Sequence, residues 1–314
     1  MKIDSNGNLI LGTTVILITT LLLLAIFVFT TLNYIENQNI DSKENDNFKY
    51  IVDDYANNIE VLGRDSMADA CDKVYHTFKL FDSEDQIKKN LNKKLEAKNE
   101  EFEQTYDVAI QSEAISVEST DTPWKVLFKV KLNIKKNANR YFRIVEKNVS
   151  IEGLRDPLPP AILTAASGIY VQGDKIHYKN ALARYMKLRN LDSPFSYLFA
   201  TSPLKIQKCP YDPYIHHGDP GVLKDCLDKG YYHESADGSC YLCRLEGKGK
   251  CPHYGMETFI QTHTPLMNDS ISCSDHVVFH DHYPGQKIDK TDINSLILDS
   301  SHRTKYGLSG EDDG

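Results

Sequence analysis

The longest apolar stretch of this chain lies near its N-terminus. Residues 9–32 contain no charged side chain, and the middle of the stretch reads LLLLAIFVF from Leu21 to Phe29. As a helix, about two dozen residues reach ~36 Å, which exceeds the ~30 Å hydrocarbon core of a bilayer. A cleaved signal sequence is the alternative, but its apolar region is usually only about 7–15 residues long. The pattern therefore predicts a transmembrane helix over residues 9–33, preceded by a short cytoplasmic leader over residues 1–8.

After a short polar joint at residues 37–47, apolar side chains recur every three or four positions. They form one seam, made of Phe48, Val52, Tyr55, Ile59 and Leu62 and, after Gly63, of Met67, Ala70, Val74, Phe78 and Phe81. This spacing is typical of a helix packed lengthwise against a partner. We expect the seam to cover the core of its own domain, and packing against copies of the chain is the alternative. Cys71, next to the seam, is expected to be a buried thiol.

A second helix is predicted to begin at Ser83. The sequence Ser-Glu-Asp-Gln from Ser83 to Gln86 matches a capping box, in which the serine hydroxyl accepts from a backbone amide of the first turn. One apolar face follows, formed by Ile87, Leu91, Leu95 and Phe102. Charged residues cover the other face, and exposure to solvent explains them without a binding partner.

From Tyr106 the apolar residues alternate with polar ones. The alternation runs over residues 106–117, 124–134 and 141–151, with turn residues at 121–123 and 135–139. It predicts three strands, and the short connections predict an antiparallel meander with one buried face. The helix over residues 48–81 is expected to cover that face.

Prolines interrupt the pattern at Asp156-Pro-Leu-Pro-Pro160, where we expect a domain boundary. The sequence thus predicts an α+β protein, with a transmembrane helix that continues into a long helix packed on the antiparallel meander. The helix and sheet would form one unit over residues 34–155. A linker with short helices would follow over 156–208. A Cys- and His-rich distal domain of irregular and β structure, with an acidic tail, would occupy 209–314.

Six of the seven cysteines crowd into the distal region. They are Cys209, Cys226, Cys240, Cys243, Cys251 and Cys273. Six cysteines allow three disulfides with fifteen possible pairings, and each closed loop contributes about 2–4 kcal/mol. Disulfides are the favoured interpretation, and they suit an oxidising exterior better than a reduced cytosol.

A metal site is the alternative. Cys240, Cys243, Cys251 and His253 offer three thiolates and an imidazole, which is a plausible tetrahedral set for zinc. It would leave Cys209, Cys226 and Cys273 outside the site. In a strand, His276, His280 and His282 would share a face, so a second metal site is conceivable there. No GxSxG, HExxH, Walker or GxGxxG motif is present, so no catalytic residue and no cofactor other than zinc is assigned.

Charge and sequons bear on location and partners. The net charge of −8 and the pI near 5.8 argue against nucleic acid or an anionic membrane surface as a partner. Asn148-Val-Ser and Asn268-Asp-Ser are glycosylation sequons. We expect a single-pass protein of the cell membrane that contacts lipid through residues 9–33, with its N-terminus inside and its ectodomain outside.

A polar leader ending in Gly7, a long apolar helix, its amphipathic continuation and an antiparallel meander together resemble the architecture of type IV pilin-like proteins. A pilin typically carries Glu five residues after the cleavage glycine, and that position is Gly12 here. The resemblance therefore implies a minor or pilus-associated subunit. Segments 151–158, 232–238 and 244–247 are also similar to uncharacterised archaeal membrane-anchored surface proteins.

The function implied is that of an extracellular structural or adhesion protein, with its own copies or other pilin-like subunits as partners. The alternative is an ectoenzyme or zinc-binding module that uses the region from Cys240 to His282.

Overall fold

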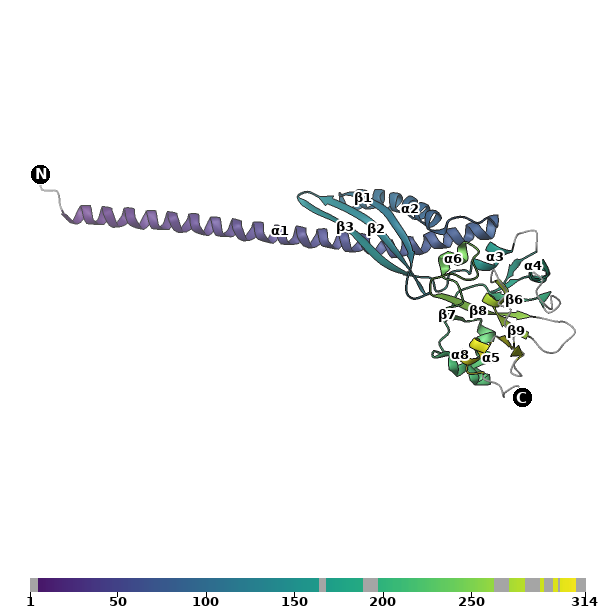
Figure 1. Ribbon diagram of the computed structural model, residues 1–314. Coiled ribbons are helices and arrows are strands. Elements are labelled where there is room, and N and C mark those ends of the chain that lie inside the picture. Colours follow the sequence, from purple (N-terminus) through teal and green to yellow (C-terminus); the bar gives the residue numbers. More distant parts are fainter. Residues whose placement is uncertain are drawn as a thin grey trace.

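The computed structural model describes residues 5–163, 168–188, 197–262, 271–279, 289–290, 296–298 and 300–308. Helix α1 (Ser5–Thr77) is one helix of 73 residues, and its N-terminal half projects from the rest of the molecule (Figure 1). Residues 37–47, where a joint was expected, are helical. Within α1, Thr14–Leu32 has a mean hydropathy of 2.7 and is 0% buried. It is long and apolar enough to cross a membrane, although a signal sequence has the same properties.

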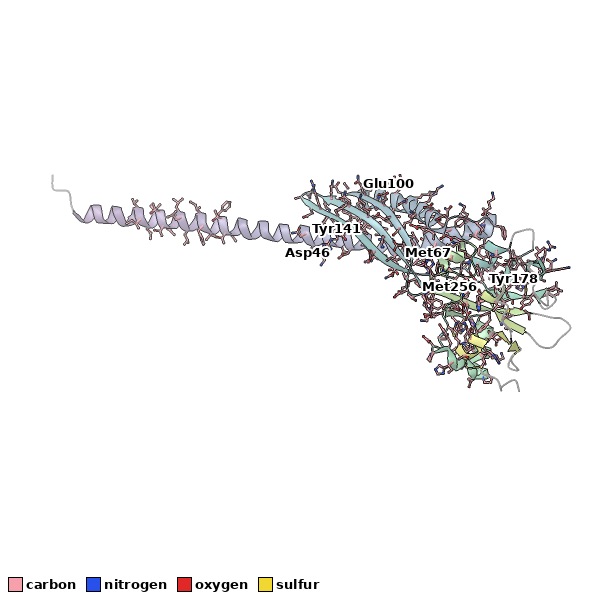
Figure 2. All side chains as sticks on the ribbon, viewed as in Figure 1. Asp46, Met67, Glu100, Tyr141, Tyr178 and Met256 are labelled. Atoms are coloured by element: carbon pink, nitrogen blue, oxygen red, sulfur yellow. The ribbon has the colours of Figure 1, made fainter. Side chains whose placement is uncertain are left out.

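The C-terminal half of α1 packs on a three-stranded sheet. The other elements of this unit are α2 (Ser83–Tyr106), β1 (Ala109–Ser119), β2 (Lys125–Lys136) and β3 (Asn139–Ser150). The strand order β1-β2-β3 with antiparallel pairing confirms the meander. Tyr55, Ile59 and Met67 of the seam are fully buried, and so is Phe128 on β2. The seam thus covers the core of its own domain. Met67, one of its residues, is labelled where α1 runs along the sheet (Figure 2).

The start of α2 differs from the expected capping box. Asp82, one residue earlier than expected, is the N-cap, and its carboxylate accepts from the backbone amide of Asp85 at 2.9 Å. Ser83 instead donates its hydroxyl to Glu246 at 2.7 Å. An ionised carboxylate is a stronger acceptor at a helix N-terminus than a hydroxyl. The displaced serine therefore ties α2 to the distal region.

Gly63 allows α1 to approach the sheet closely. A Cβ atom at this position would lie 3.3 Å from the ring of Phe128 and 3.3 Å from a methyl group of Val149. We expect Gly63→Val to lower the free energy of unfolding by about 1–3 kcal/mol, because overpacking forces the helix away from the strands. Thermal unfolding followed by circular dichroism measures this effect. Asp53→Val, on the exposed side of the same helix, is the control and should change stability little.

The remaining chain forms a second, larger sheet with short helices around it. Its elements are α3 (Leu158–Ile162), β4 (Tyr170–Gln172), β5 (Lys175–His177), α4 (Ala181–Leu188), β6 (Thr201–Pro203), the 3₁₀ helix η3 (Tyr214–Gly218), α5 (Pro220–Lys229), β7 (Tyr232–Ser235), α6 (Tyr241–Leu245), β8 (Gly255–Thr262), β9 (Ile271–Ser274), α7 (Asp275–Phe279), β10 (Asp289–Lys290), β11 (Leu296–Leu298) and α8 (Ser300–Lys305). The strand order is β10-β11-β9-β8-β6-β5-β4, with β7 paired to β8. Segment 156–208, expected to be a linker, therefore supplies three strands of this sheet.

Three buried charged side chains join the unit of the three-stranded sheet to the unit of the larger sheet. The guanidinium of Arg244 on α6 donates to Asp156, just after the first unit, at 2.8 Å and to Asp275 on α7 at 2.7 Å. These three side chains are at most 3% exposed. Residues of α6 also belong to the same apolar core as the meander. The distal region is thus packed onto the helix-and-sheet unit rather than tethered to it.

Candidate metal centres

The structure contains none of the three expected disulfides. All seven cysteines lie among the described residues, and all are free and buried. Five of them instead lie in two groups that also include histidines, and the ligand atoms of each group are within 4.8 Å of one another. The prediction of disulfides is corrected: the sulfur atoms in these groups are not bonded to one another, and imidazole nitrogens lie 3.2–3.6 Å from them.

The first group, here the Cys2His2 cluster, comprises Cys209, His217, Cys226 and His233. Its residues come from four places in the fold: the segment before η3, η3 itself, α5 and β7. Local sequence fixes α5, because Asp219 caps it through the amides of residues 221 and 222, and Gly230 ends it in the left-handed conformation. The helix then directs Cys226 inward beside Leu223 and Leu227. Each ligand is thus held by its own structural element.

The donor atoms of the Cys2His2 cluster lie at short, similar distances. Cys209 Sγ is 3.5 Å from His217 Nε2, and Cys226 Sγ is 3.2 Å from His233 Nε2. The two Nε2 atoms are 3.2 Å apart. His217 Nδ1 lies 2.7 Å from the carbonyl oxygen of Tyr214. A proton on that Nδ1 leaves the Nε2 lone pair facing the centre, which is the usual arrangement around a metal-binding histidine.

The second group, the Cys3His cluster, comprises Cys240, Cys243, Cys251 and His253. Cys240 is the N-cap of α6, Cys243 lies on that helix, and the other two residues lie on the loop before β8. His253 Nδ1 is 3.5 Å from Cys240 Sγ and 3.6 Å from Cys243 Sγ. The backbone amide of Cys240 donates to Cys251 Sγ at 3.3 Å. The alternative metal site of the sequence analysis is therefore assembled in space.

In both clusters, one cysteine thiolate disfavours the ionisation of a second cysteine. Hydrogen bonds from Cys226, His217 and His233 lower the pKa of Cys209 to about 3 despite burial. The pKa of Cys226 is raised, because Cys209 and burial both disfavour a second thiolate. Similarly, hydrogen bonds from its neighbours lower the pKa of Cys251, while the pKa of Cys243 is raised. A cation placed at the centre would remove this conflict.

The observed distances fit tetrahedral zinc. Zn–S bonds of about 2.3 Å and Zn–N bonds of about 2.0–2.1 Å place sulfur about 3.5 Å from nitrogen, and two nitrogens about 3.3 Å apart. The S···N distances in the structure are 3.2–3.6 Å, and the N···N distance is 3.2 Å. Two thiolates, two neutral imidazoles and Zn²⁺ have no net charge, which suits the fully buried cluster. The Cys3His cluster would carry one negative charge, and its His253 is exposed.

Sequence reasoning missed His217 and His233. Their only signal is a Cys followed by a His eight or seven residues later, at Cys209–His217 and Cys226–His233, and such spacing is uninformative before the loops fold. Cys273 lies outside both clusters, where its sulfur accepts from the hydroxyl of Tyr197 at 3.4 Å. Cys71 is buried as expected, and burial raises its thiol pKa.

Two other sets of predicted residues have mixed outcomes. Asn148 of the first sequon is exposed on β3, and Asn268 lies outside the described residues. His276 lies on α7, but His280 and His282 also fall outside the described residues. His276 is instead grouped with Glu257 and His302.

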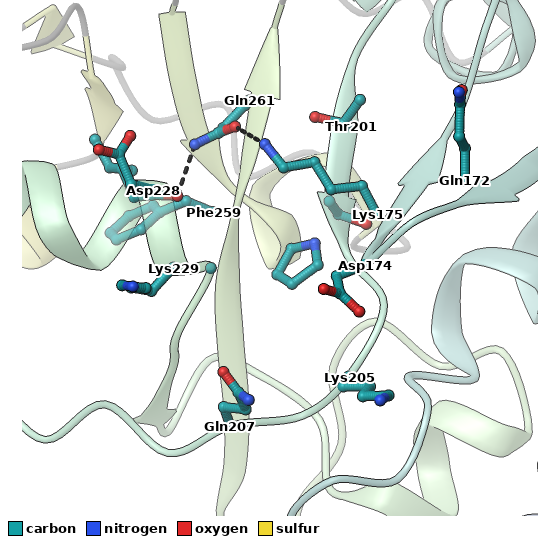
Figure 3. Close-up of a pocket in the computed structure, with 14 residues that line it drawn as sticks. Gln172, Asp174, Lys175, Thr201, Lys205, Gln207, Asp228, Lys229, Phe259 and Gln261 are labelled. Carbon is teal, nitrogen blue, oxygen red and sulfur yellow. Dashed lines mark hydrogen bonds between the residues drawn. The ribbon is translucent and has the colours of Figure 1, made fainter.

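A polar groove on the larger sheet is separate from these clusters (Figure 3). Lys175 donates to the side chain of Gln261 at 3.0 Å, and Gln261 donates to the carbonyl oxygen of Leu227 at 2.7 Å. The residues that line this groove include neither Cys nor His. Lys175 and Gln261 are thus paired with each other, and the groove offers no thiol or imidazole for catalysis.

Comparisons with protein-family models, with curated proteins and with solved structures found no match to this chain.

Proposed function

We propose that this chain is a membrane-anchored structural protein of pilin-like plan, whose distal region is folded around two zinc ions. The observation that carries the proposal is the pair of four-ligand clusters with donor distances of tetrahedral zinc. Each cluster supplies four protein ligands, so a bound zinc ion has no position left for a substrate. Such closed sites stabilise a fold and do not catalyse.

The helix α1 gives the proposed anchor and spacer. Between Leu32, at the end of the apolar stretch, and Phe48, where packing on the sheet begins, α1 rises about 24 Å. The folded part would therefore be displayed at a distance from the lipid. A long helix that is free at its N-terminal half and covered by an antiparallel sheet at its C-terminal half is similar to the plan of type IV pilin-like proteins. Minor subunits and adhesive tips use that plan.

The proposed orientation places the folded part outside, with a short N-terminus inside. Exposed Asn148 in a sequon is consistent with this orientation. The cysteines no longer support it, because free thiols in metal-ligand geometry suit a reducing compartment equally well. Protease digestion of intact and lysed cells tests orientation. Digestion of the folded part only after lysis would place it inside.

The full-length protein, purified in detergent from carbonate-washed membranes, tests the proposal. We expect two zinc ions per chain that depend on cysteine, with the five cysteines of the two clusters protected from alkylation until a chelator is added. Native and non-reducing mass spectrometry measure both quantities. Disulfides among these cysteines, or recovery of the chain in the soluble fraction, would contradict the proposal.

A further inference from the structure

A third group of potential ligands contains no cysteine. Glu257 on β8, His276 on α7 and His302 on α8 are buried, and their ligand atoms converge within 4.8 Å. Glu257 Oε2 is 2.7 Å from His276 Nδ1 and 3.0 Å from His302 Nε2. The two imidazole rings stack with centroids 4.4 Å apart. One carboxylate oxygen thus lies close to one nitrogen of each imidazole.

The remaining polar atoms of this group have partners that orient the ligands. The other oxygen of Glu257 accepts from the ammonium of Lys305 at 2.6 Å and from the hydroxyl of Tyr306 at 2.7 Å. His302 Nδ1 lies 3.2 Å from the hydroxyl of Ser301. Outer partners of this kind fix ligand orientation around metals. Glu257 Oε2 faces the two histidines and also accepts from the hydroxyl of Ser274 at 3.1 Å.

Glu257 is fully buried, with the ammonium of Lys305 against one carboxylate oxygen and the two imidazoles against the other. A buried carboxylate with two imidazoles beside one oxygen is a donor set of the kind that holds zinc or iron(II) in proteins. The ion would be held without any thiolate.

We propose that Glu257, His276 and His302 form a third metal centre, which binds a divalent transition-metal ion and keeps a coordination position open for water or a small added ligand. It contrasts with the two Cys clusters, because only three protein ligands converge among the residues that the structure describes. Three-ligand sites of two histidines and a carboxylate take water or substrate as a further ligand. Zinc and iron(II) share this chemistry.

A surface groove reaches the proposed centre. It is lined by residues that include Tyr214, Asp237, Tyr254, His302 and Lys305. The ammonium of Lys305 is paired with Glu257 at 2.6 Å, and the carboxylates of Asp212, Glu234 and Asp237 also line the groove. A small ligand would therefore reach the ion through this groove, past His302.

The experiment counts metal ions in full-length variants and probes the open position. His302→Gln removes a ligand, and His76→Gln, at an exposed position on α1, is the matched control. If three centres bind metal, native mass spectrometry should find three ions in the wild type and in His76→Gln, and two in His302→Gln. Metal analysis after separate anaerobic loading with Zn²⁺ or Fe²⁺ distinguishes the two ions.

Cobalt(II) reports on the open position in the folded wild-type protein. Acetate should change the cobalt spectrum of the wild type and of His76→Gln but leave that of His302→Gln unchanged. A wild type that holds only cysteine-dependent metal and shows no response to acetate would overturn the proposal and leave a hydrogen-bonded cluster only. That result needs only the wild-type protein, so it is decisive even if His302→Gln does not fold. The third centre uses no cysteine. A wild-type protein without the two cysteine-dependent ions would therefore contradict the proposed function but not this inference.

Discussion

Replacing Cys243 with alanine is expected to release one zinc ion and to unfold the distal region at temperatures where the wild type is folded. Structural zinc sites contribute apparent binding free energies of about 10–16 kcal/mol, comparable with or larger than the ~5–15 kcal/mol that stabilises a whole domain. Helix α6 is only five residues long, too short to be stable alone, so we expect an ion at Cys240 and Cys243 to add to the core packing that holds it. Metal analysis and thermal unfolding of the detergent-solubilised chain measure the two effects.

Cys273→Ala is the matched control for this variant. Cys273 is as deeply buried as the cluster cysteines but lies outside both clusters. Its replacement removes one sulfur from the core and should lower the free energy of unfolding by only about 1–2 kcal/mol, without loss of metal. Equal losses of stability in the two variants, with unchanged metal content, would show that the Cys3His cluster binds no structural ion.

Replacing Arg244 with methionine is expected to destabilise the protein by about 3–5 kcal/mol, because it leaves two buried carboxylates facing each other without a cation. Asp156 and Asp275 are at most 3% exposed, so water cannot replace the guanidinium. Chemical unfolding measured by circular dichroism tests this expectation. Converting both aspartates to asparagine in the same variant should restore part of the lost stability, because the repulsion is then removed.

Lys224→Met is the control for the Arg244 variant. The pair of Lys224 and Asp228 is exposed, with side chains 68% and 58% accessible, and pairs of this kind contribute about 0–1 kcal/mol. If Arg244→Met cost no more than Lys224→Met, the buried triad would not stabilise the junction between the two units.

Helix α6 carries both of the residues replaced in these variants. Cys243 belongs to the Cys3His cluster, and the next residue, Arg244, belongs to the triad that joins the distal region to the first unit. An ion that fixes α6 therefore also fixes the cation on which the junction depends. Loss of metal from this cluster should weaken the contact between the two units as well as the distal region itself.

Local regularities of the sequence predicted the first half of the fold. The seam from Phe48 to Val74 repeats every three or four residues, which indicates a helix. The alternation from Trp124 to Ile134 repeats every two residues, which indicates a strand. The α2 cap was misplaced by one residue, because Asp82 and Ser83 are both good caps and a tertiary contact to Glu246 decided between them. The sequence also could not show that segment 156–208 would supply β4, β5 and β6, each of which is only three residues long.

The sequence by itself determined the apolar N-terminal stretch, the long amphipathic helix, the antiparallel meander and the four residues from Cys240 to His253, because each is written within a short span of chain. Tertiary structure alone decided that Cys209 and Cys226 meet His217 and His233, and that Glu257 meets His276 and His302. Ligand sets drawn from separate helices and strands have no fixed spacing in sequence, since the intervening loops can have any length. Only the packing of those elements brings the donor atoms of each group within 4.8 Å of one another.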